Sequence, residues 1–156
     1  MKKITDGKSY IDSLRNRNLI VYLFGEKVKE PVDHKMIRPS INAIAKTYDL
    51  AISNPDLASV VSPFTGERVS RFLHVCTSAE ELVLQNKMQR KLGQLTGTCF
   101  QRCVGMDAFN SLYSVTYEMD EVNGSVYHSK LKEFLKFMHQ YNLVLGGAMT
   151  DVKGDR

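Results

Sequence analysis

Two cysteines four residues apart, Cys99 and Cys103, have the residue type and spacing best suited to chemistry in this sequence. The flanking pattern predicts a helix, on which residues i and i+4 share one face with Cβ atoms roughly 5–6 Å apart. Thiolates at that separation could bind two corners of one iron–sulfur cluster. Such a site needs four ligands, so Cys76, a histidine or another polypeptide would have to supply the rest. Spacing alone favours buried structural cysteines over a ligand pair.

A second candidate site lies at the end of the sequence. Backbone amides around a glycine, together with Lys, Arg and Thr side chains, can hold a phosphate group. The residues concerned are Thr150, Asp151, Lys153, Gly154 and Arg156. Taken by themselves they are typical of a polar tail.

Composition places these residues in an ordinary globular domain. The chain has 156 residues, of which 43% are hydrophobic and 24% charged, which suits one domain with a real core. The net charge of +4 is spread along the sequence, so a nucleic-acid partner is not expected. No apolar tract approaches the length that spans a membrane, so a membrane partner is not expected either. Without a secretory signal, the three cysteines are expected to be reduced thiols in the cytoplasm. Neither a G-x-S-x-G motif nor a P-loop supports a hydrolase or a nucleotide triphosphatase.

The elements that must position these residues are mainly α-helical. A cap at Thr5 or Asp6 predicts a first short helix, and residues 19–29 predict a small β-hairpin. Further helices are predicted over residues 41–52, 56–61, 78–92, 109–123 and 126–141, the third of them beginning at overlapping capping boxes around Thr77 and Ser78. Residues 71–76 are expected to be extended or irregular, and Leu143–Ala148 is strand-like.

Two glycines, Gly93 and Gly97, come just before the cysteine pair. Their spacing costs helix propensity but removes side chains from one helix face, which permits the close approach of another helix or a bound group. The pair itself would then lie directly beyond that contact.

Several blocks of the sequence resemble the N-terminal region of the 4-hydroxybutyryl-CoA dehydratase family. The wider group includes flavin-dependent 4-hydroxyphenylacetate 3-monooxygenases. The resemblance covers essentially the whole chain, and its most specific part is the cysteine block. The matching blocks are residues 21–26, 32–34, 37–42, 87–90, 99–110, 147–151 and 153–156.

This resemblance implies an acyl-CoA-dehydrogenase-like fold carrying FAD and a [4Fe-4S] cluster. The implied enzyme is a lyase and isomerase that dehydrates 4-hydroxybutyryl-CoA to crotonyl-CoA and isomerises vinylacetyl-CoA. In the family three cysteines and one histidine hold the cluster, and Cys99 and Cys103 match two of those cysteines. The other two ligands belong to a later part of the family sequence. Cys76 matches no family motif and is expected to be a core thiol.

The resemblance also gives the tail an expected role. Thr150, Asp151, Lys153, Gly154 and Arg156 match the start of the flavin-binding segment. Residues 1–145 then correspond to the N-terminal helical domain, and residues 146–156 begin a truncated middle β-domain. The missing domains or a second polypeptide would complete the flavin and CoA contacts in a homo-oligomer. No catalytic residue is expected within this chain, which alone is expected to be inactive and to hold its cofactors incompletely or not at all.

Two alternatives remain open. The chain could belong to a flavin-dependent monooxygenase of the wider group, which has no such cluster. It could also be a free-standing helical module that binds a partner or a metal without catalysis, with Cys76, Cys99 and Cys103 completing one site.

Overall fold

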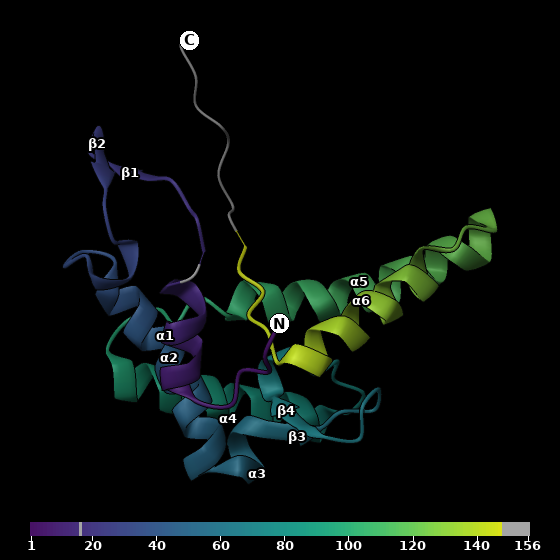
Figure 1. Ribbon diagram of the computed structural model, residues 1–156. Coiled ribbons are helices and arrows are strands. Elements are labelled where there is room, and N and C mark those ends of the chain that lie inside the picture. The colour runs from purple at the N-terminus through teal and green to yellow at the C-terminus, as the bar shows by residue number, and fades with distance from the viewer. Residues whose placement is uncertain (16, 148–156) are drawn as a thin grey trace.

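The computed structural model describes residues 1–15 and 17–147, and these residues are mainly helical, as predicted (Figure 1). They form six α-helices, two short 3₁₀ helices and two antiparallel two-stranded sheets. The helices are α1 (Gly7–Arg15), η1 (Pro31–Asp33), α2 (Arg38–Ser53), α3 (Pro55–Ala58), η2 (Arg71–Leu73), α4 (Ala79–Thr96), α5 (Cys103–Asn123) and α6 (Tyr127–Tyr141). The sheets pair β1 (Val21–Leu23) with β2 (Glu26–Val28) and β3 (Ser59–Val61) with β4 (Arg68–Ser70). In this described part of the chain, no helix is both long and apolar enough to cross a membrane.

The helices form a packed body with one projecting arm (Figure 1). Helix α1 packs along α2, and α4 crosses beside α2 and α3. Helices α5 and α6 run side by side and extend together away from the body. Three apolar clusters fill the interior, one between α2 and α4, one between α1 and α2, and one where η2 meets α5 and α6. The start of α5 belongs to the first of these clusters, which places Cys103 at the edge of the core.

Local sequence signals set several boundaries, and the cap near Ser78 and the first hairpin were predicted. The Ser78 hydroxyl accepts a hydrogen bond from the Glu81 amide and caps α4, and Gly124 ends α5 in the left-handed conformation. The predicted hairpin within residues 19–29 forms as β1 and β2. Phe24 and Gly25 both take positive φ values of 52° and 81° at its turn, the conformation that two-residue hairpin loops favour.

Two predictions of secondary structure were wrong, one of a helix and one of a strand. The helix expected over residues 56–61 ends at Ala58, and Ser59–Val61 instead pairs with Arg68–Ser70 as a second hairpin. The strand expected at residues 143–148 does not form over Leu143–Gly147, because the chain lies against α5 there and joins neither sheet. Ala148 lies outside the described residues.

The close backbone approach that Gly93 and Gly97 would permit occurs elsewhere. A methyl group at either glycine would meet nothing within 4 Å, and Gly97 serves as the left-handed cap of α4 with φ 61°. The tight position is Gly105 in the first turn of α5, where a Cβ would overlap the carbonyl group of Leu145. Gly105 therefore lets the segment after α6 lie directly on α5.

Candidate functional site

The cysteine pair belongs to the connection between α4 and α5, and the predicted helix face does not exist there. Cys99 lies in the loop that follows Gly97, whereas Cys103 is the first residue of α5. The prediction of one helix was wrong because Gly97 ends α4, and Gln101, with φ 55°, redirects the chain before α5 begins.

Side chains along this loop alternate between the core and the surface. Phe100 and Arg102 are buried, Cys99 and Gln101 are exposed, and Cys103 is half-buried. The two inward side chains anchor the loop, and Phe100 packs against Phe72 with ring centroids 5.5 Å apart. This alternation brings the two cysteines to the same side of the loop without a helix between them.

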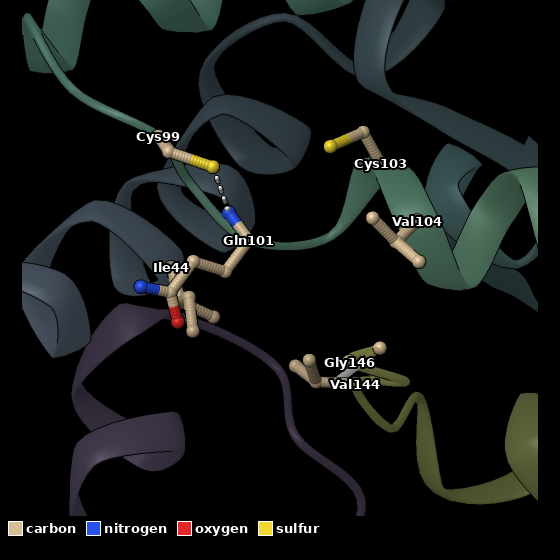
Figure 2. A pocket seen from close by; sticks show the side chains of 8 residues that line it. Ile44, Cys99, Gln101, Cys103, Val104, Val144 and Gly146 are labelled. Carbon is tan, nitrogen blue, oxygen red and sulfur yellow. Dashed lines mark hydrogen bonds between the residues drawn. The ribbon is translucent and has the colours of Figure 1, made fainter. Parts of the chain in front are cut away.

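Both cysteines line one open pocket of about 400 Å³. Figure 2 shows their sulfur atoms turned toward one another from the loop and from the first turn of α5. The Gln101 amide donates a hydrogen bond of 3.4 Å to the Cys99 sulfur. The other lining residues are Ile44, Val104, Val144, Gly146 and Gly147. Two sulfur donors thus face an otherwise largely apolar opening.

The pocket wall opposite the cysteines is the segment that follows α6. Val144 and Gly146 reach the pocket from this segment (Figure 2). Its position depends on two glycines, because side chains at Gly105 and Gly147 would overlap Leu145 and Val104 respectively. The width of the pocket is therefore set by backbone contact between α5 and this segment.

Gln101 is a pocket residue that the sequence reasoning missed. Its side chain lines the pocket, extends toward Ile44 in Figure 2 and could offer an amide to a bound group. A positive φ at a residue other than glycine is uncommon and often marks a constrained site. The sequence signal that could have identified Gln101 is its place in the centre of the cysteine block.

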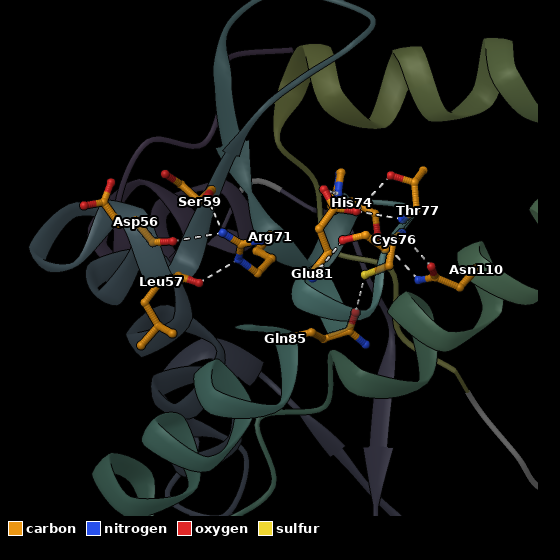
Figure 3. Close-up of polar contacts among 11 residues, drawn as sticks. Asp56, Leu57, Ser59, Arg71, His74, Cys76, Thr77, Glu81, Gln85 and Asn110 are labelled. Carbon is orange, nitrogen blue, oxygen red and sulfur yellow. Dashed lines mark hydrogen bonds and ion pairs between the residues drawn. The ribbon is translucent and has the colours of Figure 1, made fainter. Parts of the chain in front are cut away.

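Cys76 lies in a different polar cluster, shown in Figure 3. Its thiol donates to Gln85 Oε1 at 2.8 Å, and its amide donates to Asn110 Oδ1 at 2.8 Å. Burial raises the pKa of the Cys76 thiol. A nearby carboxylate, Glu81, accepts from the Thr77 amide and lies 2.8 Å from His74 Nε2, and these partners lower its pKa to about 2. Cys76 is thus a hydrogen-bonded, partly buried thiol, consistent with the role expected for it.

The residues present fit part of a metal centre. Within residues 1–15 and 17–147, no three His, Cys, Asp or Glu side chains come together closely enough to hold a metal ion. The alternative in which Cys76, Cys99 and Cys103 complete one site is therefore wrong for this fold. The tail residues Thr150, Asp151, Lys153, Gly154 and Arg156 lie outside the described residues. A four-ligand centre at the pocket would need ligands beyond Cys99 and Cys103.

Comparison with known proteins places the chain in a family. The family described as 4-hydroxyphenylacetate 3-hydroxylase N terminal matches residues 6–156. The chain belongs to this family.

Within the family, the chain is similar to the N-terminal region of 4-hydroxybutyryl-CoA dehydratases. It is 51% identical over 152 residues to the 4-hydroxybutyryl-CoA dehydratase/vinylacetyl-CoA-Δ-isomerase of Clostridium aminobutyricum, covering 96% of this chain and 31% of that protein. A solved structure of an oxygen-tolerant archaeal 4-hydroxybutyryl-CoA dehydratase from N. maritimus is 67% identical, with a TM-score of 0.92. That match covers 98% of this chain and 31% of the solved chain.

Similarity to the monooxygenases of the group is weaker. The oxygenase component of 4-hydroxyphenylacetate 3-monooxygenase from Geobacillus sp. (strain PA-9) is 24% identical over 135 residues, covering 81% of this chain and 27% of that protein. The chain thus spans about a third of the length of the relatives that it matches.

Proposed function

We propose that this chain contributes the N-terminal helical domain of a 4-hydroxybutyryl-CoA dehydratase/vinylacetyl-CoA Δ-isomerase, with Cys99 and Cys103 as two ligands of a [4Fe-4S] cluster. The observation that carries the proposal is the shared pocket, into which both sulfurs turn from different elements. The higher identity to the dehydratase than to the monooxygenase supports this assignment over the monooxygenase alternative.

The pocket supplies what two cluster ligands need and leaves room for the remaining ones. Thiolates are the usual protein ligands of iron–sulfur clusters, and an open pocket admits ligands from another segment or polypeptide. Phe100 and Arg102 are buried and anchor the loop that carries the two cysteines from its core side. Val104, Val144 and Ile44 keep the rest of the opening apolar, which limits the access of water to a bound group.

The two cofactors would divide the chemistry between them. When bound, the cluster would supply a Lewis acid and FAD an electron carrier. In this proposal residues 1–145 form the helical domain, and residues 146–156 lead into the flavin-binding domain. Thr150, Asp151, Lys153, Gly154 and Arg156 would begin the flavin site there, with their backbone amides and basic side chains suited to phosphate.

The remaining ligands, the rest of the flavin site and the CoA-ester site would come from sequence beyond this chain or from a second polypeptide. The complete enzyme would be a homo-oligomer acting on 4-hydroxybutyryl-CoA. It follows that the chain alone should show no dehydratase activity after anaerobic reconstitution.

A chimera tests the proposal directly. Residues 1–156 would replace the matching third of the Clostridium aminobutyricum relative, and the protein would be reconstituted anaerobically with iron, sulfide and FAD. We expect a stoichiometric cluster and the formation of crotonyl-CoA from 4-hydroxybutyryl-CoA. Cys99→Ser and Cys103→Ser should each lower the cluster content. Each should also lower the dehydratase activity by at least about 100-fold, the scale on which loss of a metal-site group acts.

Cys76→Ser is the matched control, because Cys76 belongs to the separate cluster of Figure 3. This variant should keep both cluster and activity. A folded chimera that loads its cluster equally well without Cys99 and Cys103 would refute the proposal, and so would one that folds but never acquires a cluster.

A further inference from the structure

Arg102, which lies between Gln101 and Cys103, is a buried cation with an unusual set of partners. It keeps 1% of its surface exposed, although a guanidinium is charged at any ordinary pH. Burying a charge is costly unless the protein compensates for it. Here no carboxylate pairs with it among the described residues, and its Nε atom has no hydrogen-bond partner.

The compensation for this charge comes from aromatic rings and neutral oxygens. The guanidinium carbon lies 4.7 Å from the ring centroids of both Tyr48 and Phe72, within the range of cation–π attraction. Nη1 donates to Thr47 Oγ1 at 2.8 Å, and Nη2 donates to the Leu143 carbonyl at 3.4 Å. One side chain thus contacts α2, η2 and the segment after α6.

These contacts join the two walls of the cysteine pocket. The Arg102 backbone is part of the loop between the cysteines, and Leu143 precedes Val144, which lines the opposite wall. The same segment is held to α2 by Tyr48, whose hydroxyl donates to the Asn142 carbonyl at 2.7 Å. Movement of Arg102 would therefore release the cysteine loop and the facing wall together.

We propose that Arg102 is a positioning residue for the Cys99 and Cys103 thiols: clamped between Tyr48 and Phe72, it fixes their loop so that both sulfurs can chelate one soft metal ion. The proposal deepens the function proposed above, because it assigns what orients the two cysteine ligands. It requires only the fold of this chain, and no iron, flavin or further ligand.

Cadmium titration of the full 156-residue chain tests this positioning role. Cd²⁺ is a soft ion that prefers thiolates, and its sulfur-to-metal charge-transfer absorbance reports thiolate coordination. The chain should bind one Cd²⁺ with this signal, and Cys99→Ser or Cys103→Ser should weaken it. Arg102→Met should raise the Kd by at least about tenfold, which corresponds to about 1.4 kcal/mol. Arg102→Lys, which keeps the charge but loses the planar fork, should recover only part of the affinity.

Arg71 provides a matched control. It is also a buried arginine, but its guanidinium donates to the carbonyls of Leu57, Asp56 and Ser59, away from the pocket (Figure 3). Arg71→Met should destabilise the fold while leaving the Cd²⁺ affinity within about twofold, below the scale of one kcal/mol. Equal loss of affinity in the Arg71 and Arg102 variants would mean that general destabilisation is responsible, and would overturn the proposal.

Thr47→Val keeps the proposal testable if Arg102→Met fails to fold. This substitution removes the hydroxyl that accepts from Nη1 and donates to the Ile44 carbonyl, and it should weaken Cd²⁺ binding measurably in a folded protein. Native-like affinity in folded Thr47→Val and Arg102→Lys variants would overturn the proposal, as would native protein whose Cd²⁺ signal does not depend on both cysteines. Because Cd²⁺ needs no family cofactor, an inactive chimera would contradict the proposed enzyme without affecting this result.

Discussion

His139 is a buried side chain whose two ring nitrogens have different partners. Nε2 lies 2.9 Å from the Leu73 carbonyl, which can only accept, so Nε2 carries the proton. Nδ1 lies 2.8 Å from the Ser62 hydroxyl, whose oxygen already accepts from the amides of Phe64 and Thr65. The Ser62 hydroxyl therefore donates to Nδ1, and this arrangement requires a neutral imidazole.

Stability should consequently fall in mild acid. Burial lowers the pKa of His139 below its ordinary value of 6.5. The unfolded chain then binds more protons than the folded chain as the pH falls below about 6.5, so the free energy of unfolding decreases over that interval. Urea unfolding at pH 7.5, 6.5 and 5.5 measures this dependence. His139→Gln should be less stable at pH 7.5 but show a flatter pH dependence, and an unchanged slope would contradict the assignment.

At the scale of elements, the contact between α5 and the segment after α6 depends on a residue without a side chain. Gly105→Ala would place a methyl group against the Leu145 carbonyl, and we expect a loss of about 1–3 kcal/mol in the free energy of unfolding, as for other overpacked sites. Gly93→Ala is the control, because it lies in α4 with open space around it and should stabilise that helix by up to about 1 kcal/mol. Chemical unfolding measures both, and a Gly105→Ala protein as stable as the native one would contradict this account.

Elements with strong local signals could be predicted from the sequence, whereas the cysteine pocket depends on distant contacts. Ser78 and Gly124 act within one turn of their own helices, so their roles could be predicted. The loop at Cys99 is shaped instead by the burial of Arg102 against Tyr48 and Phe72, residues far away in the sequence. A spacing of four residues suggested one helix because sequence alone does not reveal such partners. That the two cysteines face the same side could be predicted, but the loop geometry that brings them together could not.

At the scale of the whole molecule, the arm formed by α5 and α6 carries an apolar stripe. Its α5 part consists of Leu112, Val115, Met119 and Val122, which recur at helical spacing and are 39–82% exposed. Exposed apolar residues this close together are typical of interaction surfaces. The relatives are about three times as long as this chain, so we infer that further sequence or a second copy covers the stripe in a complete enzyme.

The chain by itself should therefore self-associate through this arm. Sedimentation velocity over a range of concentrations should show a rising average mass, and Leu112→Ser combined with Val115→Ser should shift the protein toward monomer. Because both side chains are about half exposed, we expect the double variant to lose only about 1 kcal/mol in the free energy of unfolding. Ile52→Ser, at an exposed apolar residue of α2, is the control and should leave association unchanged. Burial of the apolar surface of the stripe is the driving force expected for this association. A native chain that stays monomeric at every concentration would therefore contradict the prediction.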